Sequence, residues 1–167
     1  MRGKNYTQKS DIYSFGIIIY EVINGLPPYH DAAHDEYLGL KICQGLRPKF
    51  NIKIPQIIEN IFKQCVDADP SKRPTAENLY EIFNQWHYDL YRMYSEIYKQ
   101  FKEADEFNKK QPTFTKLSNN TELIYETHPQ AIYTSRLLNF NNLPEPKNAD
   151  DVEYSGKDYC YLLKLVY

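Results

Sequence analysis

Hydrophobic positions in the first part of the chain form three segments separated by polar breaks. Residues 11–24 are apolar nearly all round, and their length favours a buried helix over a strand. Ser10 is a suitable N-cap, and Gly25 followed by two prolines ends the helix. Residues 32–43 and 55–65 predict two further helices, the second of which starts at a proline. The pattern therefore predicts a mainly α fold.

A longer amphipathic segment follows the polar loop at residues 67–74. Thr75 is a suitable N-cap, and no glycine or proline interrupts residues 76–110. Steps of three and four between apolar residues predict one continuous helix, whose first part packs on residues 11–24. The second part outruns a single small lobe, so we expect the tail to cover it; a coiled-coil seam is the alternative. The apolar positions are Leu79, Phe83, Trp86, Leu90, Met93, Ile97, Phe101 and Ala104.

The composition becomes polar after residue 111. Residues 112–153 carry many Asn, Thr and Pro residues, and residues 143–151 have almost nothing to bury, which is typical of a linker. Residues 159–167 are apolar and β-prone, and are either a strand without a partner or an aggregation-prone end. The tail residues expected to cover the long helix are Ile124, Ile132, Leu137, Leu138 and Phe140.

Length and charge restrict the classes of function. The 167 residues suffice for one domain and a tail, and a net charge of −2 provides no basic field for nucleic acid or an anionic membrane. The three cysteines form no CxxC pair and the four histidines share no metal-ligand spacing, so neither zinc nor a disulfide framework is expected. No leader or membrane-length apolar run is visible, so we expect a cytoplasmic protein.

Three short motifs carry the functional information. Residues 10–16 read Ser-Asp-Ile-Tyr-Ser-Phe-Gly, residues 21–29 end in Gly-Leu-Pro-Pro-Tyr, and residues 65–75 read Cys-Val-Asp-Ala-Asp-Pro-Ser-Lys-Arg-Pro-Thr. In this order they resemble signatures of the C-terminal lobe of a eukaryotic protein kinase of the tyrosine-kinase-like type. The combination is specific, and the resemblance covers residues 1 to about 86.

The resemblance implies an architecture. It implies the helical C-terminal lobe of the protein-kinase fold, without the β-rich N-lobe, followed by a long helix and a largely irregular tail. The expected division is a partial kinase domain over residues 1–86, a helical extension over 87–110 and a low-structure tail over 111–167.

The resemblance also implies roles for single residues. Asp11 corresponds to an aspartate that binds backbone amides of the catalytic loop, and Glu21 belongs to the exit motif of its helix. Gly16 is small where elements pack closely, whereas Val66 replaces a larger residue and predicts looser packing. Arg73 corresponds to an arginine that pairs with the glutamate of A-P-E. That motif is missing here, so we expect Asp11 and Arg73 to be solvated and Arg73→Leu to be tolerated.

The catalytic motifs of the family are missing from the printed sequence, which begins ten residues before Asp11. It contains no Gly-rich phosphate loop, no β3 lysine, no helix-C glutamate, no H-R-D-x-x-x-x-N and no D-F-G. Phosphoryl transfer needs these groups to hold metal, nucleotide and substrate. We therefore expect no catalytic residue, no metal site and no cofactor in this chain, although the intact family uses ATP and Mg²⁺.

Three functions remain open on the sequence. The chain is a truncated kinase, which we favour, or a non-catalytic pseudokinase-like binding module, or a scaffold that acts through its long helix. A protein partner would dock on residues 32–43, which correspond to the family's substrate-docking helix, or on the long helix. The candidate docking residues are Tyr29, Tyr37, Leu38, Ile97 and Phe101.

Overall fold

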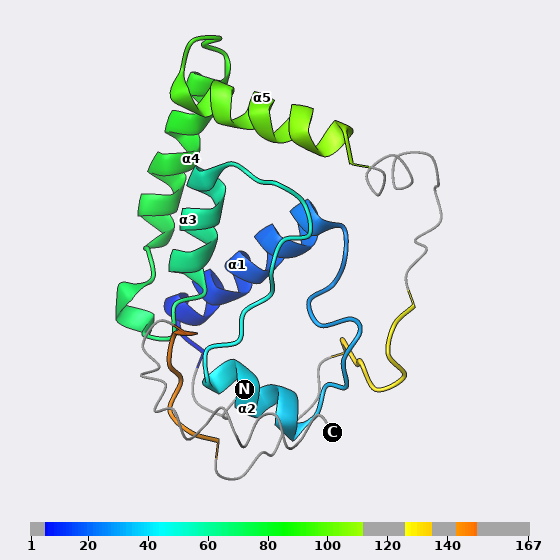
Figure 1. The fold of residues 1–167 in the computed structure, drawn as a ribbon. Coiled ribbons are helices and arrows are strands. Elements are labelled where there is room, and N and C mark those ends of the chain that lie inside the picture. Colours follow the sequence, from blue (N-terminus) through cyan, green and yellow to red (C-terminus); the bar gives the residue numbers. More distant parts are fainter. Residues whose placement is uncertain (1–5, 112–125, 135–142, 150–167) are drawn as a thin grey trace, which may run out of the picture.

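The computed structural model describes residues 6–111, 126–134 and 143–149. In these ranges the chain forms α-helices and one 3₁₀ helix, with no strand (Figure 1), which confirms the mainly α prediction. The elements are α1 (Gln8–Asn24), α2 (Glu36–Cys43), α3 (Gln56–Cys65), η1 (Pro70–Lys72), α4 (Ala76–Leu90) and α5 (Glu96–Lys109).

Helix α1 starts earlier than the sequence predicts. Thr7, not Ser10, is the N-cap, and its Oγ1 accepts the backbone N–H of Ser10 at 3.2 Å. The Ser10 hydroxyl accepts the backbone N–H of Thr7 in return, so the two residues form a capping box. The predicted end is confirmed, since Gly25 has a left-handed φ of 68° and its N–H bonds to the carbonyl of Glu21 at 2.9 Å.

Helix α1 packs against α3 and the first part of α4. Two buried clusters lie at this contact, and Phe15 of α1 meets Phe83 of α4 edge to face with ring centroids 5.8 Å apart. The packing of the first part of α4 on α1 is therefore confirmed. One cluster contains Ile12, Ile61, Cys65 and Leu79, and the other contains Tyr20, Phe62 and Val66.

One face of α1 remains exposed. Residues at every fourth position, such as Ile12 and Tyr20, are buried against α3. On another face, Ile18 is 55% exposed and Val22 is 77% exposed. The expectation of all-round burial is therefore wrong for this face, because the described residues supply no element that covers it.

Helix α2 is shorter than residues 32–43. Asp35 is its N-cap, with its carboxylate accepting the backbone N–H of Leu38 at 3.0 Å. The preceding residues form an irregular loop in which Tyr29 adopts a φ of 55° and its carbonyl accepts the N–H of Ala32. The backbone before Asp35 therefore forms a hydrogen-bonded turn, and the helix begins only after it.

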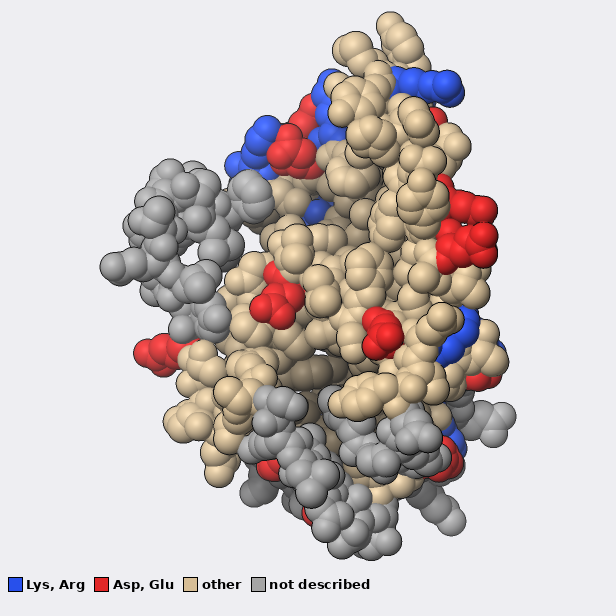
Figure 2. All heavy atoms as spheres, turned by 180° about the vertical axis from the view of Figure 1, so that it is seen from behind, with Lys and Arg blue, Asp and Glu red and all other residues tan. Residues whose placement is uncertain are grey.

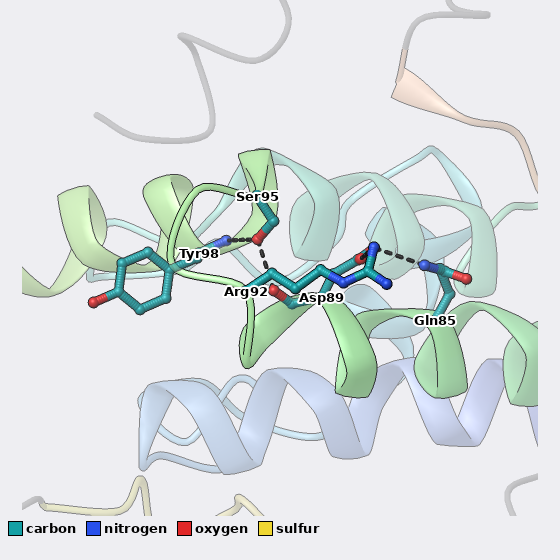
Figure 3. Close-up of polar contacts among 5 residues, drawn as sticks. All are labelled: Gln85, Asp89, Arg92, Ser95 and Tyr98. Carbon is teal, nitrogen blue, oxygen red and sulfur yellow. Dashed lines mark hydrogen bonds and ion pairs between the residues drawn. The ribbon is translucent and has the colours of Figure 1, made fainter.

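The predicted long helix is broken between α4 and α5. Figure 3 shows the turn, in which the Ser95 hydroxyl donates to the carbonyl of Asp89 at 2.7 Å and accepts the backbone N–H of Tyr98 at 3.1 Å. Ser95 is therefore the N-cap of a new helix and also bonds the end of the old one. The Asp89 carboxylate meets Gln85 and Arg92, which fixes the turn further.

Helix α5 turns back toward the start of α3. Asn108 is buried, and its side-chain amide makes two bonds with the backbone of Lys53, at 2.9 Å and 2.7 Å. Ala104 is also buried, and Gln100 accepts the N–H of Ile57 at 3.4 Å. In the described part of the chain, the buried positions of α5 therefore lie against the start of α3 and the residues before it. Most of the tail residues expected to cover the long helix lie outside the described residues, so cover by the tail stays a prediction, as does the coiled-coil alternative.

We expect Asn108→Ala to release α5. The substitution leaves the N–H and the carbonyl of Lys53 without their partner in a partly buried position, which costs about 1 kcal/mol. Amide hydrogen exchange should become faster in α5 and stay unchanged in α1. Asn84→Ala, at an exposed position of α4, is the control. Equal exchange rates in α5 of both variants would show that Asn108 does not hold the helix.

Two tail segments lie against the lobe (Figure 1). Residues 126–134 contact the loop between α1 and α2, where the N–H of His128 bonds to the carbonyl of His30 at 2.8 Å. Residues 143–149 contact the end of α2, where the N–H of Lys147 bonds to the carbonyl of Cys43 at 2.8 Å. The linker interpretation is therefore wrong for residues 143–149. Residues 159–167, Ile124, Leu137, Leu138 and Phe140 lie outside the described residues.

The surface carries charges of both signs. Figure 2 shows acidic and basic side chains scattered among uncharged ones on the rear face. Among the described residues, none of the helices has the length and apolar character needed to cross a membrane.

Candidate functional site

Tyr13 of α1 lies between two arginines at the centre of the motif region. The guanidinium carbon of Arg73 is 5.0 Å from the centre of the Tyr13 ring, and that of Arg47 is 5.9 Å away. Both distances allow an attraction between the cation and the ring. Burial raises the pKa of Tyr13, although the two arginines oppose that shift, so the phenol stays neutral and holds the cations by its ring.

Arg73 is partly buried and bonded to backbone carbonyls. Its Nε donates to the carbonyl of Asp67 and its Nη1 to that of Lys9, both at 2.8 Å. Lys9 in turn donates through its ammonium to the carbonyls of Arg73 and Pro74. Desolvation lowers the pKa of Arg73, consistent with its burial. The expectation that Arg73 is solvated is therefore wrong, because loop carbonyls take the place of an acidic partner.

Arg47 was not singled out from the sequence. Its Nε donates to the carbonyl of Val66 at 2.8 Å, and its Nη1 donates to the carbonyls of Ile42 and Leu46 at 2.9 Å and 2.8 Å. It therefore ties the end of α2 to the end of α3. The only sequence signal was its place before Pro48 at a helix break, and that signal does not identify its acceptors.

Two further motif residues lie on the exposed surface. Asp11 is exposed in the first turn of α1, and its carboxylate has no hydrogen-bond partner within the described part of the chain. Glu21 is exposed in the last turn, and its carbonyl binds Gly25.

Gly16 lies where α1 and α3 approach most closely. A Cβ atom at this position would be 2.8 Å from both Cys65 Cβ and Val66 Cγ1. The need for a small residue is therefore confirmed. Val66 is 2% exposed, and looser packing around it stays a prediction.

The five docking candidates do not form one surface. Figure 1 shows α2 and α5 at opposite ends of the molecule. Near α2, Tyr29 is half-buried with its hydroxyl 3.4 Å from the carbonyl of Leu46, and burial raises its pKa. Tyr37 is 50% exposed, with the Lys41 ammonium 4.4 Å from the centre of its ring. Leu38 on α2 and Ile97 and Phe101 on α5 are all half-buried.

The cluster around Tyr13 is suited to holding elements together. In the described ranges, no group of three His, Cys, Asp or Glu side chains could hold a metal ion. Cys65 lies beneath the cluster without exposure, and burial raises the pKa of its thiol to about 11, so it stays neutral.

The fold and these motifs agree with comparisons to known proteins. Residues 1–83 match the family described as protein tyrosine and serine/threonine kinase. A probable tyrosine-protein kinase of Dictyostelium discoideum is 41% identical over 92 residues, which cover 50% of this chain and 26% of the relative. The Arabidopsis thaliana protein kinase and PP2C-like domain-containing protein is 35% identical over 96 residues, covering 47% and 15%. Human mitogen-activated protein kinase kinase kinase 7 is 33% identical over 81 residues, covering 48% and 13%.

The helices and motifs therefore define a unit like the C-terminal lobe of a kinase. Residues 1–83 are a fragment of a protein kinase domain. The chain spans about a quarter of the Dictyostelium relative and a smaller share of the other two.

Proposed function

We propose that this chain is the helical docking half of a protein kinase and that it does not transfer phosphate by itself. The observation that carries the proposal is the exposed apolar face of α1, with Ile18 and Val22 more than half exposed. A central helix that leaves such a face open is suited to receive another part of a larger domain. In a complete kinase, that part would supply the groups that hold ATP and Mg²⁺.

The exposed face lines a groove of about 380 Å³ between α1, α3 and α4. All of its lining residues are apolar, so burying the groove against another structural element is favourable by the hydrophobic effect alone. The lining residues are Phe15, Ile18, Ile19, Val22, Ile23, Ile58, Ile61, Phe83 and Trp86.

We expect the isolated chain to show no saturable binding of Mg-ATP. The sequence has none of the motifs that contact the phosphates or the metal, and charged phosphates bind weakly without them. Isothermal titration calorimetry with millimolar Mg-ATP measures this, with a complete kinase domain from a relative as the positive control. Saturation in the micromolar range would show that the chain forms a nucleotide site of its own.

A non-catalytic binding module is the second candidate function. It is favoured by the tail segments, since residues 126–134 and 143–149 are held at the two ends of α2 by hydrogen bonds. The third function, a scaffold that acts through one long helix, is not supported, because that helix ends at Leu90 and a second helix begins at Glu96.

A further inference from the structure

Residues 128–133 form a compact turn that lies on the loop between α1 and α2. The N–H of Ala131 bonds to the carbonyl of His128 at 2.8 Å, and Pro129 occupies the second position, where its fixed φ suits a turn. The N–H of Gln130 also bonds to Nδ1 of His128 at 3.1 Å. Local sequence therefore stabilises the bound shape, which lowers the entropy cost of docking.

Backbone groups fix the position of this turn on the loop. The N–H of His128 donates to the carbonyl of His30 at 2.8 Å, and the N–H of His34 donates to the carbonyl of Gln130 at 3.0 Å. Each segment thus gives one N–H and accepts one. These bonds recognise the shape of the peptide backbone, whatever protein it belongs to.

Tyr133 adds recognition by a side chain. Its hydroxyl donates to the carbonyl of Pro28 at 3.1 Å, and its ring meets the ring of His34 edge to face with centroids 4.8 Å apart. The Tyr133 side chain is nevertheless 49% exposed. The contact is therefore specific in geometry and small in area, as expected of a reversible interaction.

The ring of His34 links the two segments. Its Nδ1 is 3.0 Å from the carbonyl oxygen of Ile132, and its Nε2 is 3.2 Å from that of Tyr29. Carbonyl oxygens only accept hydrogen bonds, and a neutral imidazole donates through one nitrogen alone. The ring of His34 therefore contacts a carbonyl of each segment, and the tautomer decides which of the two accepts its hydrogen bond.

We propose that the loop of residues 28–34 is a docking site for short turn peptides, and that residues 128–133 occupy it within the same chain. The peptide that fits has proline at the second position of the turn and tyrosine four residues after that proline. The proposal holds whether or not the chain is part of an active kinase, so the ATP titration does not decide it.

A labelled peptide of residues 126–134 tests the site on the full chain. Tyr133→Ala weakens the internal competitor, so the peptide should bind this variant about tenfold more tightly than it binds the wild-type chain. Tyr94→Ala, at a position 92% exposed, is the matched control and should behave as wild type. A peptide that carries Tyr133→Ala should not bind. Absence of saturable binding to the Tyr133→Ala chain, or equal affinity for all three chains, would overturn the proposal.

Discussion

Arg73→Leu should destabilise the chain by about 2–4 kcal/mol, because it removes the charged hydrogen bonds of the guanidinium to three backbone carbonyls and its contact with an aromatic ring. The carbonyls of Lys9 and Asp67 lose their donor in the partly buried space between α1 and η1. The loss is a large share of the roughly 5–15 kcal/mol that stabilises a typical domain. Urea unfolding followed by circular dichroism measures it as a lower midpoint with an unchanged slope.

The same substitution at a solvated arginine provides the control. Arg92 is 76% exposed and lies 3.9 Å from Asp89, so Arg92→Leu should change stability by about 0–1 kcal/mol. Arg73→Lys should lie between the two, since lysine keeps the charge and loses the planar fork. If Arg73→Leu unfolds at the same urea concentration as Arg92→Leu, the carbonyl contacts of Arg73 do not stabilise the fold.

Gly16→Val should cost about 3 kcal/mol through overpacking. Even the first added carbon would lie 2.8 Å from Cys65 Cβ and Val66 Cγ1, so α1 and α3 must move apart. Ser14→Val, at an exposed position of the same helix, should stay within about 0.5 kcal/mol of wild type. Thermal and urea unfolding of both variants compare the two positions.

A double-mutant cycle identifies the contact responsible. Val66→Ala removes one of the two atoms that a side chain at position 16 would meet. Gly16→Ala should therefore be better tolerated in the Val66→Ala background than in the wild-type chain, with a coupling energy of about 0.5–3 kcal/mol. Strict additivity of the two substitutions would show that the close approach of α1 to α3 is not the cause.

Local patterns predicted much of the fold. The helix over residues 11–24, its end at Gly25 and the N-cap at Thr75 all follow from residues that are close in sequence. The need for a small residue at Gly16 came from a motif, and the structure gives its physical cause. These features depend on short-range geometry, which one sequence contains.

The break before α5 illustrates what a local pattern leaves undecided. Ser95 is a good N-cap, yet the apolar steps continue across it, so both one helix and two satisfy the pattern. A cap contributes only about 0.5–2 kcal/mol, and contacts far away in sequence decide the outcome. Here Asn108 binds the backbone of Lys53, and the sequence gives no sign of that pairing.

The sequence also did not predict the hydrogen-bond acceptors of Arg73. The motif indicated that the arginine matters, but its acceptors are main-chain carbonyls, and every residue has one. The tail contacts have no periodic signal at all, since Tyr133 and Pro28 are 105 positions apart. The candidate site was therefore predicted in its motif residues and missed in Arg47, Tyr13 and the docked turn.

The hydrogen bonds of residues 126–134 to the loop before α2, and of residues 143–149 to the end of α2, can form only late in synthesis. Residues 28–46 leave the ribosome long before residues 126–149, and elongation proceeds at about 5–20 residues per second. For several seconds, the carbonyls of His30 and Cys43 therefore lack the hydrogen bonds that the N–H groups of His128 and Lys147 later donate. During that interval the loop before α2 and the end of α2 are accessible to other binders, and the chain covers them itself only after residues 126–149 have been made.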